Sequence, residues 1–172
     1  PKDTLEYICY LHSKIGFLHH VSTLNPFGSN HFAWIDYDIC NMWKDVAKNQ
    51  AFLRHMHRHG LQHITQLPPT ETTSSQAVTS EHELVIPTCW NYEKHSMNEL
   101  CNRVCWRFCT NFFVGTSVAI QHLYYLYTEH YERFLATYKT MTWDMNFLAY
   151  LEQEHQWKPI TYNAHHDDSM IQ

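Results

Sequence analysis

The sequence predicts an α/β fold in a single domain that spans residues 1–172. Three observations carry this prediction. Apolar residues recur at helical spacing in several long segments, short apolar runs lie between them, and turn-forming residues separate the two kinds of segment. Because strands that alternate with helices are typical of α/β proteins, we expect a sheet flanked by helices. A chain of 172 residues is long enough to bury a substantial core.

The first third of the chain predicts a helix, a strand and a second helix. Residues 4–24 carry apolar residues at spacings of three and four, which is typical of an amphipathic helix. Turn-forming residues at 25–30 end this helix, and the apolar residues 32–35 predict a buried strand. Residues 42–59 predict a helix that ends at Gly60, in the position that a C-cap glycine takes.

The rest of the chain predicts a loop followed by further strands and helices. Residues 65–80 contain eight Ser or Thr and two Pro without an apolar period, so we expect a mobile loop there. Thr142 is the expected N-cap of a late helix, because its hydroxyl can accept a backbone N–H. The other predicted elements are a strand at 83–87, a buried strand at 104–114 closed by Gly115, a helix at 117–135, a helix at 143–154, a strand at 160–162 and a polar tail at 165–168.

Composition excludes several classes of protein. The formal net charge is −5 with only 12 Lys and Arg, so the chain lacks the basic surface that a nucleic-acid partner needs. It has no apolar run of about 18 residues, so we expect no transmembrane segment. Its four Gly form no glycine-rich phosphate loop. No signal peptide or Asn-x-Ser/Thr site is present and the six Cys are sparse, which favours a cytoplasmic location.

Two carboxylates follow the predicted strand at 32–35. Asp36 and Asp38 are spaced i, i+2, and ligands of α/β sheets gather where strands end. Hard oxygen ligands of this kind suit Mg²⁺ or Mn²⁺ bound together with a phosphorylated ligand. Acidic pairs are also common in turns, so the pattern leaves a metal site and a plain turn both open.

Asp144 and the polar tail are weaker candidates. In the first turn of its predicted helix, Asp144 either complements the helix dipole or acts as a base beneath a ligand cleft, with Trp143 as an apolar wall. The tail His165-His-Asp-Asp168 is either solvated or folds back so that an imidazole completes a metal shell.

Two further series of residues have helical spacing. Three His recur at intervals of four and either lie on an exposed helix face or bind Zn²⁺, although Gly60 interrupts the helix among them. Three Cys recur at the same interval, and we expect them to be buried thiols because they lack the short spacing of structural zinc sites. The His are His55, His59 and His63, and the Cys are Cys101, Cys105 and Cys109.

Six segments, taken in order, resemble the HtrL/YibB family of glycosyltransferase-like proteins. The most specific are the Phe-Ala-Trp-Ile-Asp run that ends at Asp36 and the Trp-Arg-Phe-Cys run that ends at Cys109. Together the segments cover most of the chain, from about residue 5 to residue 171. They are residues 25–29, 31–36, 86–90, 104–109, 142–146 and 164–169.

The resemblance implies a GT-A-like mixed sheet flanked by helices and a metal-dependent transfer of sugar. The donor would be a nucleotide-sugar, and the acceptor a hydroxyl of a glycan or another molecule. In such enzymes the Asp-x-Asp binds Mn²⁺ or Mg²⁺ and the diphosphate, which assigns the metal to Asp36 and Asp38, with His166 as a third ligand. If the enzyme inverts configuration, Asp144 would take a proton from the acceptor hydroxyl. The residues assigned to substrate binding, with the tryptophans stacking on a sugar face, are Trp90, Trp106, Arg107, Trp143, Asn146 and Asp168.

The chain also departs from the family's usual pattern. Asp38 stands where Gly is usual, Thr110–Asn111 where Gly-Gly is usual, and Asp144 where Glu is usual. A GT-A fold places several strand–helix units before the acidic motif, whereas only 35 residues precede Asp36. We therefore expect the C-terminal metal and acceptor part of such an enzyme, with a sheet that is incomplete at the N-terminus. The alternative is a catalytically degenerate module of the same fold that binds a glycan or a protein.

Overall fold

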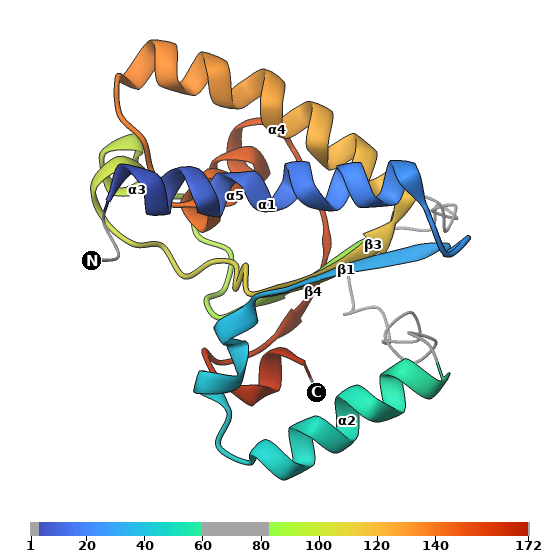
Figure 1. Cartoon of the computed structure of the whole chain (residues 1–172). Coiled ribbons are helices and arrows are strands. Elements are labelled where there is room, and N and C mark those ends of the chain that lie inside the picture. Colours follow the sequence, from blue (N-terminus) through green and yellow to red (C-terminus); the bar gives the residue numbers. More distant parts are fainter. Residues whose placement is uncertain (1–3, 60–82, 172) are drawn as a thin grey trace, which may run out of the picture.

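The computed structural model describes residues 4–59 and 83–171. They form three layers, with the sheet in the middle (Figure 1). Helices α1, α4 and α5 lie on one side of the sheet, and α2 lies on the other side with the C-terminal segment. The predicted α/β fold is confirmed. The described elements are α1 (Leu5–Leu24), β1 (His31–Ile35), the 3₁₀ helix η1 (Tyr37–Met42), α2 (Val46–His59), β2 (Leu84–Thr88), α3 (Met97–Asn102), β3 (Phe112–Thr116), α4 (Ser117–Tyr138), α5 (Asp144–Glu154), β4 (Ile160–Asn163) and the 3₁₀ helix η4 (Asp168–Met170).

The sheet brings several distant segments to one edge. Its strand order is β1-β3-β2-β4, with β3 antiparallel to both β1 and β2, and β2 parallel to β4. The last residue of β1, Ile35, therefore pairs with the first residue of β3, Phe112, and Thr88 pairs with Asn163. We call this the strand-end edge. The residues that follow β1, β2 and β4 and those that precede β3 all meet there.

Both faces of the sheet are buried, so the central strands are continuously apolar. On β3, Phe113 packs into the core beneath α1, α4 and α5, while Phe112 and Val114 pack into the smaller core on the opposite face. On β2, Ile86 belongs to the first core and Val85 to the second. Successive strand residues thus alternate between two cores, which fixes the register of the sheet.

Helix α1 begins and ends as the sequence predicts. The Thr4 hydroxyl accepts the N–H of Tyr7 at 3.2 Å as an N-cap. At the C-terminal end Asn25 adopts a left-handed conformation with φ 39°, and its backbone N–H donates to the carbonyl of Val21. Gly28, with φ 62°, completes the turn into β1.

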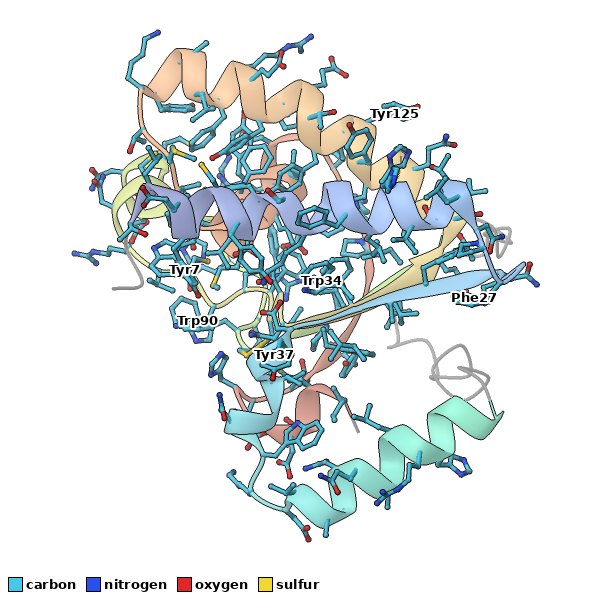
Figure 2. The ribbon with its side chains drawn as sticks, in the orientation of Figure 1. Tyr7, Phe27, Trp34, Tyr37, Trp90 and Tyr125 are labelled. Atoms are coloured by element: carbon cyan, nitrogen blue, oxygen red, sulfur yellow. A yellow bond between two sulfur atoms is a disulfide. The ribbon has the colours of Figure 1, made fainter. Side chains whose placement is uncertain are left out.

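Strand β1 differs from its prediction in one respect. It pairs with β3 alone and forms an edge of the sheet, so its side chains are only partly buried. The sequence run 32–35 is apolar because Phe32 and Trp34 pack beneath the helices, and Trp34 stacks with Phe17 of α1. Figure 2 shows Trp34 between α1 and the sheet.

Two predicted elements begin later than expected. The strand predicted at 104–114 starts only at Phe112, since backbone bonds tie the preceding segment to the end of β2. The N–H of Cys109 donates to the carbonyl of Pro87 at 2.9 Å, and the N–H of Trp90 donates to the carbonyl of Trp106 at 3.0 Å. The helix predicted at 42–59 starts at Val46, after the 3₁₀ helix η1.

Thr142 is not the N-cap that the sequence predicts. Its hydroxyl donates to the carbonyl of Leu100 instead, and Trp143 occupies the N-cap position of α5 without a side-chain cap bond. The prediction fails because a tertiary partner competes for the hydroxyl. The Thr142 bond joins the start of α5 to α3.

The prediction of three buried thiols holds in part. Cys105 is a buried free thiol and Cys101 is half-buried, whereas Cys109 forms a disulfide with Cys89 across the strand-end edge. Gly60, the loop predicted at 65–80 and His63 lie outside the described residues. No helix within the described ranges has the length and apolarity to cross a membrane, in line with the sequence.

Candidate functional site

Three charged side chains from distant parts of the chain meet in the interior. The Nζ atom of Lys14 lies 2.9 Å from Oδ2 of Asp36 and 3.5 Å from Oδ2 of Asp144. The exposed fractions of the three residues are 2%, 8% and 4%. We call them the Lys14 cluster. Asp36 and Asp144 were predicted as site residues from separate motifs, and the fold brings both to one ammonium group.

Each member of the cluster is held by its element. Lys14 lies on the buried face of α1, with Leu11, Ile15 and Leu18. Asp36 follows β1 at the strand-end edge, and its N–H donates to the carbonyl of Asn111 at 2.8 Å. Asp144 is the first residue of α5, where its Oδ1 accepts the N–H of Met145 at 2.9 Å.

Asp36 is closely surrounded by donors. Its Oδ1 accepts the indole N–H of Trp34 at 2.6 Å, and its Oδ2 accepts the amide of Asn111 at 2.8 Å in addition to the Lys14 ammonium. The ammonium also lies 3.4 Å from the carbonyl oxygen of Thr110. The Thr110–Asn111 dipeptide thus supports both members of the Lys14–Asp36 pair.

The cluster carries one positive and two negative charges. Burial alone lowers the pKa of Lys14, but the carboxylates of Asp144 and Asp36 outweigh it, and the pKa lies above its ordinary value of 10.5. Lys14 is therefore an ammonium at neutral pH. The cluster thus joins this one ammonium to two carboxyl groups, those of Asp36 and Asp144.

The described residues do not fit the metal ion that the sequence predicts at Asp36. All three side-chain groups within bonding distance of this carboxylate are nitrogen donors, and one of them is a cation that would repel Mn²⁺ or Mg²⁺. Asp38 lies in η1, and the structure does not describe its side chain. Within residues 4–59 and 83–171, no three or more His, Cys, Asp or Glu side chains form a group able to hold a metal. The cofactor stays a prediction from the sequence.

His12 anchors the segment that leads to Asp144. Its Nε2 lies 2.7 Å from the carbonyl oxygen of Thr142, and its Nδ1 lies 2.5 Å from the hydroxyl of Tyr127. Because a carbonyl can only accept, Nε2 carries the proton, and Nδ1 accepts from Tyr127. Burial is the main cause that lowers the pKa of His12, against the opposing effects of Thr142 and Asp144. The imidazole is therefore neutral at pH 7.

The sequence analysis missed both Lys14 and His12. A signal was present for Lys14, since it stands three residues after Leu11 and four before Leu18 on an otherwise apolar face. A charged residue in that position is rarely buried without a partner. His12 showed no comparable signal, because its two partners are more than a hundred residues away.

A second site lies at the same edge of the sheet. Cys89, Trp90, Trp106, His165 and His166 line a pocket of about 430 Å³, which we call the tryptophan pocket. It unites three residues that the sequence assigned to the site: Trp90, Trp106 and His166. His166 lies edge-to-face against Trp106, with 4.5 Å between the ring centroids. This contact places the His166 ring against the wall of the tryptophan pocket.

The other predicted binding residues make internal contacts. Arg107 donates to both carboxylate oxygens of Glu152, at 2.7 and 2.6 Å, and to the carbonyl of Trp90 at 3.0 Å. The Asn146 side chain bonds three backbone groups of residues 100–105. Asp168 accepts a bond from Asn49 at 3.2 Å. These three side chains therefore form hydrogen bonds within the protein, and Arg107 holds the backbone of Trp90 in place.

Trp143 borders a further pocket, beside the start of α5. This pocket has a volume of about 480 Å³ and is lined by Ile8, Cys101, Asn102, Val104, Met141, Thr142 and Trp143. The Trp143 ring contacts Tyr7 of α1 edge-to-face at 6.1 Å. Trp143, which the sequence suggests as an apolar wall, thus lines this pocket, whereas Asp144 is not among the lining residues.

The comparisons with known proteins identify a family. A family model described as "Bacterial protein of unknown function (HtrL_YibB)" matches residues 3–140, which is most of the chain. Lys14, Asp36 and Trp106 lie inside the matched range, while Asp144 and His166 lie beyond it. No curated protein and no solved structure is significantly similar to the chain.

Proposed function

The chain belongs to the HtrL/YibB family, and on that premise we propose that it transfers a sugar from a nucleotide-sugar donor to an acceptor hydroxyl. The observation that carries this proposal is the Lys14 cluster. Asp36 and Asp144 belong to two motifs that resemble parts of a glycosyltransferase and are more than a hundred residues apart. Both carboxylates contact the buried ammonium of Lys14. An ion pair that only stabilises the fold needs one carboxylate for its ammonium, whereas Lys14 contacts two.

Asp144 is the carboxylate with capacity to react. Among the described residues, Asp36 accepts three side-chain donors, whereas Asp144 accepts the N–H of Met145 and faces Lys14 at the longer distance of 3.5 Å. Since each carboxylate oxygen has two lone pairs, Asp144 retains room for an incoming hydroxyl. The pocket lined by Thr142 and Trp143, the two residues that precede Asp144, is the proposed route by which the reacting hydroxyl reaches this carboxylate.

In the proposed reaction Asp144 acts as the general base. The acceptor oxygen forms a bond to the anomeric carbon of the donor sugar as its proton passes to the Asp144 carboxylate. The bond between that carbon and the phosphate oxygen breaks, and the nucleoside diphosphate leaves with the electron pair. Lys14 places its ammonium 3.5 Å from the Asp144 carboxylate, and His12 contacts the carbonyl of Thr142 and so fixes the backbone two residues before Asp144. The proposal includes no step at a metal ion.

A second candidate function is a catalytically degenerate module that binds a glycan or a protein. One contrast favours it: the Lys14 cluster is closed by internal bonds, whereas the tryptophan pocket is open and Trp90 is 46% exposed. In that case the cluster would serve stability alone, and the pocket would carry the function.

The test is turnover of nucleotide-sugars by the protein. UDP-glucose, UDP-galactose, UDP-N-acetylglucosamine and GDP-mannose are offered with methyl glycosides as acceptors, and release of nucleoside diphosphate is measured. Asp144→Asn should lower turnover by about 10²–10⁴, the range for loss of a general base. Asp45→Asn is the matched control, since Asp45 is an exposed carboxylate at the start of α2.

The two candidate functions predict different results. A transferase releases nucleoside diphosphate and is sensitive to Asp144→Asn but not to Asp45→Asn. Undiminished turnover in Asp144→Asn contradicts the assignment of the base. Glycan binding without release from any donor supports the degenerate module instead.

A further inference from the structure

We propose that the tryptophan pocket binds a single neutral pyranose. Under the proposed function this sugar is a unit of the acceptor glycan, and only that role rests on the proposed function. The binding itself is expected whether or not the chain catalyses transfer.

The lining indicates a neutral and amphipathic ligand. None of its five residues, Cys89, Trp90, Trp106, His165 and His166, is Lys, Arg, Asp or Glu. Two are indoles, which offer apolar faces and one N–H each, and two are imidazoles, which donate and accept hydrogen bonds. A pyranose presents C–H groups on its faces and hydroxyls around its rim, so it matches both kinds of group.

The arrangement of rings favours a sugar over a nucleobase. The planes of Trp106 and His166 are inclined at 62°, with their centroids 4.5 Å apart. Crossed rings leave no parallel slot between them for a flat base, but they place a polar ring beside an apolar one. The pocket volume of about 430 Å³ also lies within the range of roughly 300–1,000 Å³ that is usual for small-molecule sites.

The walls of the pocket are held rigidly. Both backbone groups of Trp90 are bonded, since its N–H donates to Trp106 and its carbonyl accepts from Arg107. Arg107 is itself fixed by its two bonds to Glu152, and the Cys89–Cys109 disulfide closes the base. A preorganised site of this kind loses little conformational entropy on binding.

The fold places this pocket at the same edge of the sheet as the Lys14 cluster. Trp90 follows β2, His165 and His166 follow β4, and Asp36 follows β1, all at the strand-end edge. Cys109, which is bonded to Cys89 of the pocket, directly precedes Thr110, whose carbonyl contacts Lys14. Figure 2 shows Trp90 beside the ends of the strands. A sugar in the pocket would therefore lie at the same end of the sheet as the proposed base.

The experiment is an NMR titration of the six tryptophan indole N–H signals with simple sugars. The probes are the methyl glycosides of glucose, galactose, mannose and N-acetylglucosamine, and the nucleosides uridine and guanosine. We expect at least one glycoside to shift the Trp90 and Trp106 signals at millimolar concentration. Trp90→Ala should weaken this binding about tenfold, the equivalent of about 1.4 kcal/mol.

Two further variants keep the outcome decisive. Tyr125→Ala is the matched control, because Tyr125 is an aromatic residue 57% exposed on α4, away from the pocket (Figure 2). His166→Ala should also weaken binding and covers the case in which Trp90→Ala does not fold. The proposal is overturned if no glycoside shifts the two signals, if only the nucleosides do, or if Trp90→Ala and His166→Ala both bind as well as the wild type. An inactive Asp144→Asn variant that still binds the sugar would leave this inference intact.

Discussion

The Lys14 cluster and the tryptophan pocket lie at the same edge of one sheet, yet they are built in opposite ways. The cluster is charged, nearly inaccessible and closed by hydrogen bonds within the protein. The pocket has no charged side chain in its lining and exposes an indole to solvent. We propose that the cluster moves a proton and that the pocket recognises a ligand. The difference predicts that mutations will separate stability and turnover from binding.

The largest effect on stability should come from breaking the cluster. Lys14→Met leaves two buried carboxylates without their cation and should lower the free energy of unfolding by about 3–5 kcal/mol. Urea denaturation measures this loss. Lys44→Met is the control, because Lys44 pairs with Asp167 at the surface and its side chain is 76% exposed.

A triple variant sharpens this prediction. Lys14→Met with Asp36→Asn and Asp144→Asn removes all three charges and should recover part of the lost stability. If Lys14→Met alone is as stable as the wild type, the three groups do not form the buried cluster described above.

The next largest effect should come from the link between the two regions. Replacing both Cys89 and Cys109 by Ala removes a disulfide that spans 20 residues and should cost about 2–4 kcal/mol. Because Cys109 adjoins Thr110, the same variant should also weaken sugar binding and lower turnover together. Thermal unfolding and the glycoside titration check both effects. A change in stability without any change in binding would show that the disulfide does not shape the pocket.

The stability of the protein should depend on His12 below about pH 6.5. The pKa of His12 lies below its ordinary value of 6.5 chiefly because of burial, so the unfolded chain takes up this proton more readily than the folded one. Stability is fully present above pH 6.5 and decreases as the pH falls. His155, whose pKa burial also lowers, contributes in the same direction. Urea midpoints between pH 5 and 8 should therefore vary less in His12→Gln than in the wild type, with His155→Gln as the comparison.

The smallest effect on stability is expected in the pocket. Trp90→Ala removes a half-exposed ring that lies outside the main core and should leave the urea midpoint almost unchanged, although sugar binding falls. Trp157→Ala is the opposite case, since that ring is buried against Phe108 in the core and should cost about 3–5 kcal/mol. Equal losses in the two variants would contradict the contrast between the regions.

Measuring the affinity for Mn²⁺ distinguishes two predictions, one made from the sequence and one made from the donors around Asp36. The sequence predicts that Asp36→Asn loses most of the affinity for Mn²⁺. The three nitrogen donors around Asp36 predict instead that the wild type and Asp36→Asn bind Mn²⁺ equally weakly. Calorimetric titration with MnCl₂ decides between them, and a clear loss in the variant would restore the metal site.

Much of the fold follows from local sequence patterns. The α1 helix, the β2 and β4 strands and the turn at Asn25 were predictable because capping residues and apolar spacing act over a few residues. The start of β3 and the cap of α5 were not, since tertiary partners decide them. Local patterns assigned Cys109 to a strand and the Thr142 hydroxyl to a helix cap. Cys109 instead donates its N–H to the carbonyl of Pro87, and Thr142 donates to the carbonyl of Leu100.

The candidate site was predictable only in pieces. Motifs pointed to Asp36, Asp144 and the tryptophans one at a time, because each lies in a recognisable segment. Their grouping depends on the sheet register, which joins Trp90, Trp106 and His166 in one pocket and directs Asp36 toward Lys14 instead. The pairing of Cys89 with Cys109 likewise depends on the fold, since spacing alone does not determine which cysteines meet.

The most direct test of the central claim is to measure turnover and sugar affinity side by side in Asp144→Asn and Trp90→Ala. We predict that Asp144→Asn lowers kcat by about 10²–10⁴ while the glycoside affinity stays unchanged. Trp90→Ala should raise the acceptor KM about tenfold with little change in kcat. If Asp144→Asn turns over at the wild-type rate, or if each variant alters kcat and affinity together, the division between a catalytic cluster and a binding pocket is wrong.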